Sequence, residues 1–215
     1  MKHLLLTLSL LLATLGVHAQ DEVTQLTLLP DFAPATIQLS TGKKLEIPLA
    51  NIFLKNAALL YKSGDKTMQA NMTTVVAADF GKRHFVKVGN QLAEQLYDDN
   101  HGYGLYCVST IDMAAYETMV QNANVITSLS LGDNVSMTTT ELMSDDERQL
   151  PLVRNYLLRI DGSMVEAQER AVKRALNKEQ RKRLNSQLSR RGFSWTSQQS
   201  LTDLLQALRA IVGSN

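Results

Sequence analysis

The pattern of hydrophobic and polar positions divides the chain into two regions. Between residues 25 and 160, short runs rich in β-branched, aromatic and Leu residues alternate with turn residues such as Ser63-Gly64-Asp65. In the run ATIQLS, Ile37 and Leu39 alternate with polar residues, which predicts a half-buried strand. Parallel strands need crossovers of a dozen or more residues, and these turns are shorter. The pattern therefore predicts an antiparallel meander, barrel-like or a sandwich.

The predicted strands are the runs QLTLL, ATIQLS, KKLEIPL, NIFLKNAALLYK, TMQANMTTVVAADF, RHFVKVG, YGLYCVSTI, NVITSLSL, VSMTTTELM and NYLLRID. We expect two short helices between them, over residues 90–97 and 113–122. Asp112 is well placed to cap the second of these.

After Gly162 the period of apolar residues becomes helical. A helix is expected over about 167–176, and Asn177 with Gln180 forms a capping box that starts a second helix. Thr196 with Gln199 predicts the cap of a third, amphipathic helix. The fold class is thus α+β, a mainly antiparallel β domain over 20–162 followed by a three-helix C-terminal module over 163–215.

The first 19 residues have the layout of a cleavable signal peptide. Lys2 precedes an apolar run from Leu4 to Leu15, and Val17-His18-Ala19 offers a cleavage site before Gln20. We expect a periplasmic or secreted protein with no membrane span after cleavage. An exported protein does not meet chromosomal DNA, so we expect no nucleic-acid partner.

Charge is distributed unevenly along the chain. Residues 20–162 hold 11 basic and 17 acidic residues, whereas residues 163–215 hold 10 basic and 4 acidic residues. This asymmetry indicates either two faces that attract each other or a cationic module directed at an anionic partner.

Most of the positive charge lies between residues 170 and 191, which include nine Lys or Arg and one acid, Glu179. On the second helix the basic residues cannot all share the Leu184/Leu188 face, so a solvated charged face is the first interpretation. The second is an anion-binding surface. Its candidate residues are Lys178, Arg181, Lys182, Arg183, Arg190 and Arg191.

Signals of catalysis are weak. The single cysteine, Cys107, lies in an apolar run and is expected to be a core residue. The loop YDDNHGYG clusters Asp98, Asp99 and His101, which a divalent cation or a hydrolytic reaction could use, but a polar surface turn has the same composition. We assign no catalytic residue, no metal ligand and no cofactor from the sequence.

The stretch from Tyr156 to Leu208 carries a family resemblance. Ile160-Asp161-Gly162, Leu176, Leu184, Leu188, Phe193 and Leu201-Thr202-Asp203-Leu204-Leu205 resemble the C-terminal module of uncharacterised exported β-rich proteins of Bacteroidota-type Gram-negative bacteria. The resemblance implies an exported protein with this two-part fold. It implies no catalytic residue.

Three functions stay open at this point. The first is non-enzymatic binding or interaction with the cell envelope, whose components or anionic glycans would be the partners. The second is a secreted hydrolase of glycan or peptide built on Asp98, Asp99 and His101. The third is a polyanion or anionic-surface binder that uses the basic helix.

Overall fold

The computed structural model describes residues 26–129 and 150–212. These residues form a ten-stranded antiparallel sheet followed by helices, which confirms the α+β class. The strands are β1 Ala33–Leu39, β2 Lys44–Phe53, β3 Ala58–Ser63, β4 Lys66–Gln69, β5 Val75–Phe80, β6 Arg83–Val88, β7 Gln91–Asp98, β8 Gly104–Ile111, β9 Leu152–Ile160 and β10 Ser163–Glu166. The helices within the described ranges are α2 Met113–Leu129, α3 Glu169–Ala175, α4 Lys178–Leu188 and α5 Gln198–Val212.

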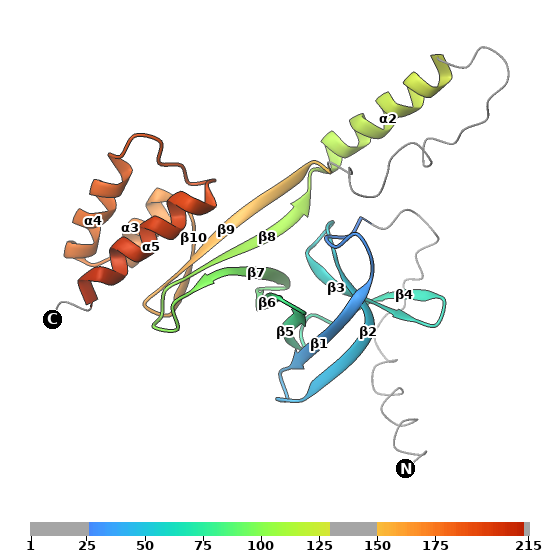
Figure 1. Cartoon of the computed structure of the whole chain (residues 1–215), viewed down its shortest axis with the longest axis horizontal. Helices are drawn as coiled ribbons and strands as arrows, with labels where there is room; N and C mark the ends of the chain where they lie inside the picture. The colour runs from blue at the N-terminus through green and yellow to red at the C-terminus, as the bar shows by residue number, and fades with distance from the viewer. Residues whose placement is uncertain (1–25, 130–149, 213–215) are drawn as a thin grey trace.

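The strands run in the order β10-β9-β8-β7-β6-β5-β1-β2-β3-β4. Neighbours in sequence are neighbours in the sheet, except that β5 returns to pair with β1. The predicted meander is therefore present with one crossover. In Figure 1 the paired strands β8 and β9 form a long ribbon, with β1–β6 at one end of the molecule and α3, α4 and α5 at the other.

The first of two large cores, which we call the sheet core, lies among strands β1 to β7. Ala35 and Ile37 on β1 are buried and Leu39 is partly buried against the same cluster, which confirms the alternation predicted for this strand. The rings of Phe80 and Phe85 meet edge to face at 5.7 Å. The buried members are Ala35, Ile37, Ala50, Ile52, Ala58, Leu59, Met72, Val75, Ala78, Phe80, Phe85 and Leu92.

The second large core, which we call the helical core, joins one end of the paired strands β8 and β9 to the C-terminal helices. Leu105 on β8 and Leu158 on β9 are fully buried there, below the amphipathic helix α5. Phe193 and Trp195 pack edge to face at 5.1 Å in the turn before α5. The buried members are Tyr103, Leu105, Leu158, Ile160, Ala167, Val172, Leu176, Leu184, Leu201, Leu204, Leu205 and Leu208.

Strand β8 lies between the helical core and a third, smaller cluster. It is buried at nearly every position because opposite faces pack against different partners. Leu105 faces the helical core, whereas Tyr106 and Val108 join a small cluster with Ala57 and Ala93. This accounts for the continuous apolar run in the sequence, which a strand with one solvated face would not need.

The helix predicted over 90–97 is wrong, because these residues form strand β7. Gln, Leu, Ala and Glu favour helices as isolated residues. Here the segment lies between β6 and β8 and hydrogen-bonds to both. Leu92 and Ala93 point to opposite faces of the sheet and are buried in different clusters. Tertiary pairing thus overrides the local preference.

The second interrupting helix is present and longer than predicted. α2 begins after Asp112, whose Oδ1 accepts the Ala115 N–H at 3.1 Å, so the predicted cap is confirmed. The helix continues to Leu129, and the strand predicted over 124–131 is therefore wrong up to that residue. A capped helix extends cheaply once nucleated, which favours continuation through β-branched residues. The strand predicted over 135–143 and the signal peptide lie outside the described residues.

The C-terminal helices follow the predicted order. The capping box of α4 is confirmed in both directions, since Asn177 and Gln180 each accept the other's backbone N–H at 2.9 Å. At α5 the cap is Ser197 rather than Thr196, because Ser197 Oγ accepts the Ser200 N–H at 3.3 Å and the helix begins at Gln198.

Candidate functional site

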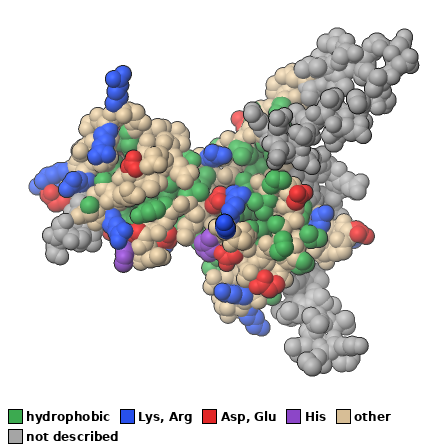
Figure 2. Space-filling view, viewed as in Figure 1, with side chains coloured by type: hydrophobic (Ala, Val, Ile, Leu, Met, Phe, Trp, Pro, Cys, Tyr) green, Lys and Arg blue, Asp and Glu red, His purple; other side chains and the backbone are tan. Residues whose placement is uncertain are grey.

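The basic residues of α3 and α4 are placed by the apolar faces of these two short helices. Val172 on α3 and Leu184 on α4 are fully buried, so the charged positions take the remaining circumference. Lys and Arg side chains project over this end of the molecule in Figure 2.

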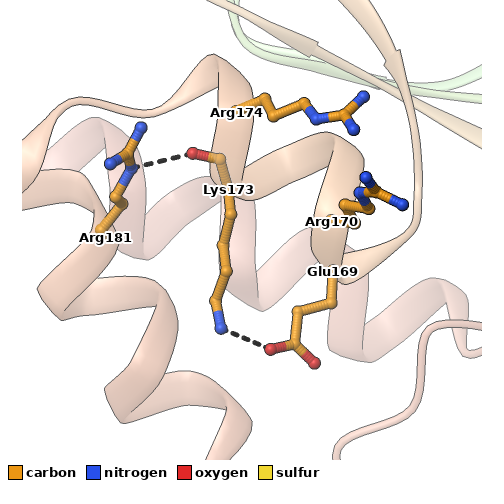
Figure 3. Close-up of a pocket in the computed structure, with 5 residues that line it drawn as sticks. All are labelled: Glu169, Arg170, Lys173, Arg174 and Arg181. Atoms are coloured by element: carbon orange, nitrogen blue, oxygen red, sulfur yellow. Dashed lines mark hydrogen bonds and ion pairs between the residues drawn. The ribbon is translucent and has the colours of Figure 1, made fainter.

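A groove of about 570 Å³ opens between α3 and α4. Four cationic side chains and one carboxylate line it, which gives the lining a net charge of +3. The lining residues are Glu169, Arg170, Lys173, Arg174 and Arg181, drawn in Figure 3. A concave surface of one sign of charge attracts and concentrates counter-ions. We call it the basic groove.

Two contacts organise the basic groove. Lys173 Nζ lies 2.5 Å from Glu169 Oε1, one turn earlier on α3, and so neutralises the one acid of the lining. Arg181 Nε donates to the backbone carbonyl of Lys173 at 2.8 Å, which ties α4 to α3. Both contacts are visible in Figure 3 as dashed lines.

Arg170 and Arg174 differ from these residues. Neither side chain makes a hydrogen bond or an ion pair with any residue of the described ranges. In Figure 3 their guanidinium groups lie on the same side of α3, and Arg181 approaches from the other side. The groove therefore holds two guanidinium groups with all donors available and a third that has used one.

Only Arg181 of the six predicted anion-binding residues lines the groove. Lys178, Arg183, Arg190 and Arg191 are exposed elsewhere. Lys182 is exposed too and pairs with Glu179 at 3.0 Å. These basic side chains are thus exposed, which both interpretations of the sequence require.

Sequence reasoning missed the contribution of α3. Arg170, Lys173 and Arg174 recur at i, i+3 and i+4, which places them on one face of a helix. That spacing was the available signal.

The position of α4 depends on a buried polar cluster at its N-terminus. The Gln180 side chain is 2% exposed, and its Nε2 donates to Tyr103 Oη and to Asp161 Oδ2, both at 3.1 Å. The Tyr103 hydroxyl donates to Asp161 Oδ1 at 2.6 Å. Burial and the bond to Asp161 raise the pKa of Tyr103 to about 12. Gln180 is next to Arg181, so this cluster fixes one wall of the groove to the turns β7–β8 and β9–β10, which hold Tyr103 and Asp161.

The acidic loop between β7 and β8 is held by contacts within the fold. Asp98 Oδ1 accepts from Arg159 Nη2 at 2.5 Å and from the Asn100 N–H at 2.7 Å. Its Oδ2 accepts from the Tyr106 hydroxyl at 3.0 Å. Burial, followed by this bond, raises the pKa of Tyr106 to about 12.

Asp99 is enclosed by the loop itself. Its Oδ1 accepts the N–H groups of His101 and Tyr103, and its Oδ2 lies 3.4 Å from Arg209 Nε on α5. Burial opposes ionisation, but these N–H donors and the Arg209 charge outweigh it, so the pKa of Asp99 is lowered. The His101 side chain is exposed. Within the described ranges, no group of three His, Cys, Asp or Glu side chains could hold a metal ion.

Cys107 is buried at 4% exposure, as expected of a core residue. Burial raises the pKa of its thiol, which disfavours the reactive thiolate.

A second cavity, of about 750 Å³, lies on β1, β2 and β5 at the other end of the molecule. Its carboxylates are Asp31, Glu46 and Asp79. Glu46 accepts the Thr36 hydroxyl at 3.0 Å, and Asp79 pairs with His84 Nδ1. This second cavity and the basic groove thus lie on different strands and helices, and neither neutralises the charge of the other.

No protein-family model, curated protein or solved structure matches this chain. The resemblance to exported Bacteroidota-type proteins accordingly stays a prediction. Among the described helices, none is long and apolar enough to cross a membrane.

Proposed function

We propose that this protein is exported and works without catalysis, by binding an anionic component of the cell envelope. The observation that carries the proposal is the basic groove, which three guanidinium groups line, two of them without a partner among the described residues. Unpaired Arg side chains in a concave surface are suited to anionic groups, since the guanidinium fork matches carboxylate and phosphate oxygens.

Export is proposed from the N-terminal sequence. Lys2, the apolar run from Leu4 to Leu15 and the short residues Val17 to Ala19 together have the three regions of a signal peptide. An exported chain of this kind meets membrane surfaces and glycans that carry negative charge, which is the partner that the basic groove favours.

The contacts of the acidic loop support binding over hydrolysis. A hydrolase built on Asp98, Asp99 and His101 needs carboxylates that are open to a substrate. Asp98 is instead engaged by Arg159 and Tyr106, and the Asp99 side chain is 0% exposed.

The test is sedimentation of the mature chain with vesicles. Vesicles of phosphatidylcholine with phosphatidylglycerol should retain the protein at low salt, and vesicles of phosphatidylcholine alone should not. Lipopolysaccharide in place of phosphatidylglycerol should retain it as well. Binding should weaken strongly as salt rises, because exposed charges are screened beyond roughly 8 Å at physiological ionic strength. Equal retention by neutral and anionic vesicles, or by neither, contradicts the proposal.

A further inference from the structure

We propose that the basic groove is a binding site for a phosphate monoester group, held by the guanidinium groups of Arg170 and Arg174 on α3, with Arg181 of α4 contributing positive charge from the other side of the groove. This inference rests on the proposed function and names the chemistry that its site recognises. It concerns the groove itself, and not the exposed basic residues elsewhere on α4.

The first argument is the number of free donors. A guanidinium group carries five N–H donors in a fixed planar fork. Arg170 and Arg174 use none of theirs in the described part of the chain, and Arg181 uses only Nε, on the Lys173 carbonyl. The two whole forks of Arg170 and Arg174 are thus available to the acceptor oxygens of one ligand, and the Nη groups of Arg181 remain available on the other side of the groove.

The second argument is charge. Lys173 already compensates Glu169, so three positive charges remain in one concave lining. Arg170 and Arg174 stand one helical turn apart, where like charges destabilise a helix. A phosphate monoester carries about −1.5 to −2 charges at pH 7 and three strong acceptor oxygens. A carboxylate or a sulfate ester carries one charge and compensates the groove less completely.

The third argument is preorganisation. Arg181 follows Gln180, which is fixed by the capping box and by its bonds to Tyr103 and Asp161. On α3, Val172 is fully buried between the two free arginines. The backbone is therefore set before a ligand arrives, and only side-chain ends need ordering. A groove of 570 Å³ also has room for a sugar-sized group attached to the phosphate.

The experiment titrates the mature protein with glucose 1-phosphate and, separately, with inorganic phosphate and glucose, observed by calorimetry and by amide shifts of α3 and α4. Glucose 1-phosphate should bind and glucose should not. Binding of inorganic phosphate at equal strength shows that the phosphate alone is recognised. If the protein binds vesicles that contain phosphatidic acid but binds neither glucose 1-phosphate nor inorganic phosphate, the groove recognises the phosphate monoester of a lipid headgroup.

The matched variants keep total charge equal. Arg170→Gln with Arg174→Gln should weaken phosphate binding by about tenfold or more, since each loses charge-assisted hydrogen bonds. Arg190→Gln with Arg191→Gln removes the same charge outside the groove and should bind nearly as the parent does. If both double variants weaken binding equally, the phosphate is attracted by the overall positive charge and not by a site in the groove, and the proposal is overturned. Arg174→Lys keeps the charge and loses the fork, so it should bind several-fold more weakly than the parent, and unaltered affinity contradicts bidentate recognition.

Melting curves identify any variant that fails to fold, and the single change Arg170→Gln then replaces the double. The two proposals fail separately in this design. If the parent binds anionic vesicles and no phosphate monoester, only the present inference is wrong. If it binds neither, the proposed function is wrong as well.

Discussion

The two ends of the molecule each attach a peripheral segment through one buried amide side chain. In the sheet core, Asn51 is 0% exposed and bonds to backbone atoms alone: it accepts from the N–H groups of Leu29 and Ile52 and donates to the carbonyls of Leu29 and Asp31. In the helical core, Gln180 bonds to the side chains of Tyr103 and Asp161.

The difference determines what each amide stabilises. Apart from the Ile52 N–H on β2, the backbone atoms freed by the loss of Asn51 belong to residues 29–31 before β1, where water can replace it. Tyr103 lies in the loop between β7 and β8, and Asp161 lies in the turn between β9 and β10. Both contact the buried Gln180 of α4, where an unsatisfied group costs its full desolvation. Loss of Gln180 should therefore destabilise the whole helical core, whereas loss of Asn51 should destabilise mainly residues 26–31.

The largest expected effect comes from truncating either large core. Ile37→Ala in the sheet core and Leu204→Ala in the helical core should each cost about 2–5 kcal/mol of unfolding free energy, as buried aliphatic truncations do. Trp195, the single tryptophan, reports on the helical end by fluorescence, and circular dichroism reports on the whole. Since β7 places Leu92 in the sheet core and Leu96 against the helical core, Ile37→Ala should lower the midpoint of both signals together. A Trp195 transition that stays at the parent midpoint would show two independent units.

The amides come next. Gln180→Leu should cost about 1–3 kcal/mol of unfolding free energy, because the Tyr103 hydroxyl and the Asp161 carboxylate each lose a partner. Tyr103→Phe is the milder control, expected to cost about 1 kcal/mol, because Gln180 keeps its bond to Asp161. Denaturant unfolding measures both.

Asn51→Leu should act locally. Hydrogen exchange is expected to speed up at residues 26–31 while the core strands stay protected. Uniform loss of protection across the molecule would remove the contrast between the two amides.

The loop charge of Asp99 should give a smaller effect that depends on pH. Its folded-state pKa lies below the usual 3.8, so the ionised carboxylate stabilises the fold above about pH 4. This contribution is lost as the pH falls through the folded-state pKa. Asp99→Asn should flatten the stability profile below about pH 4, whereas Asp65→Asn in an exposed turn should not. Identical acid profiles for the parent and Asp99→Asn would show that Asp99 contributes nothing.

The smallest effect on stability is expected on the exposed face of α4. Arg181, Lys182 and Arg183 changed together to Gln should melt nearly as the parent does, because the Lys182–Glu179 ion pair is exposed and contributes about 0–1 kcal/mol, and the Arg181 bond to the Lys173 carbonyl is exposed as well. The same variant should bind anionic vesicles more weakly. Leu188→Ala is the comparison, since Leu188 packs partly against the helical core. If the triple variant unfolds more readily than Leu188→Ala, the basic residues are structural.

Local sequence determined most of the secondary structure and the fold class. Alternation in β1, the Asp112 cap, the capping box at Asn177 and the leucine spacing of α5 are properties of neighbouring residues, and each is present in the structure. Caps and periodicity act within a few residues, so sequence alone specifies them.

Tertiary structure decided the rest. Residues 91–98 became a strand because β6 and β8 pair with them, although their composition favours a helix. The basic groove depends on the approach of α3 to α4, so the sequence showed a basic segment without showing that Arg170, Arg174 and Arg181 line one groove. Likewise the acidic loop looked like a site by composition, and the partners of Asp98 and Asp99 come from Arg159 and Arg209, far along the chain. Contacts between distant residues have no signature in local pattern, and in this protein they decide which charged side chains are engaged and which remain free to bind.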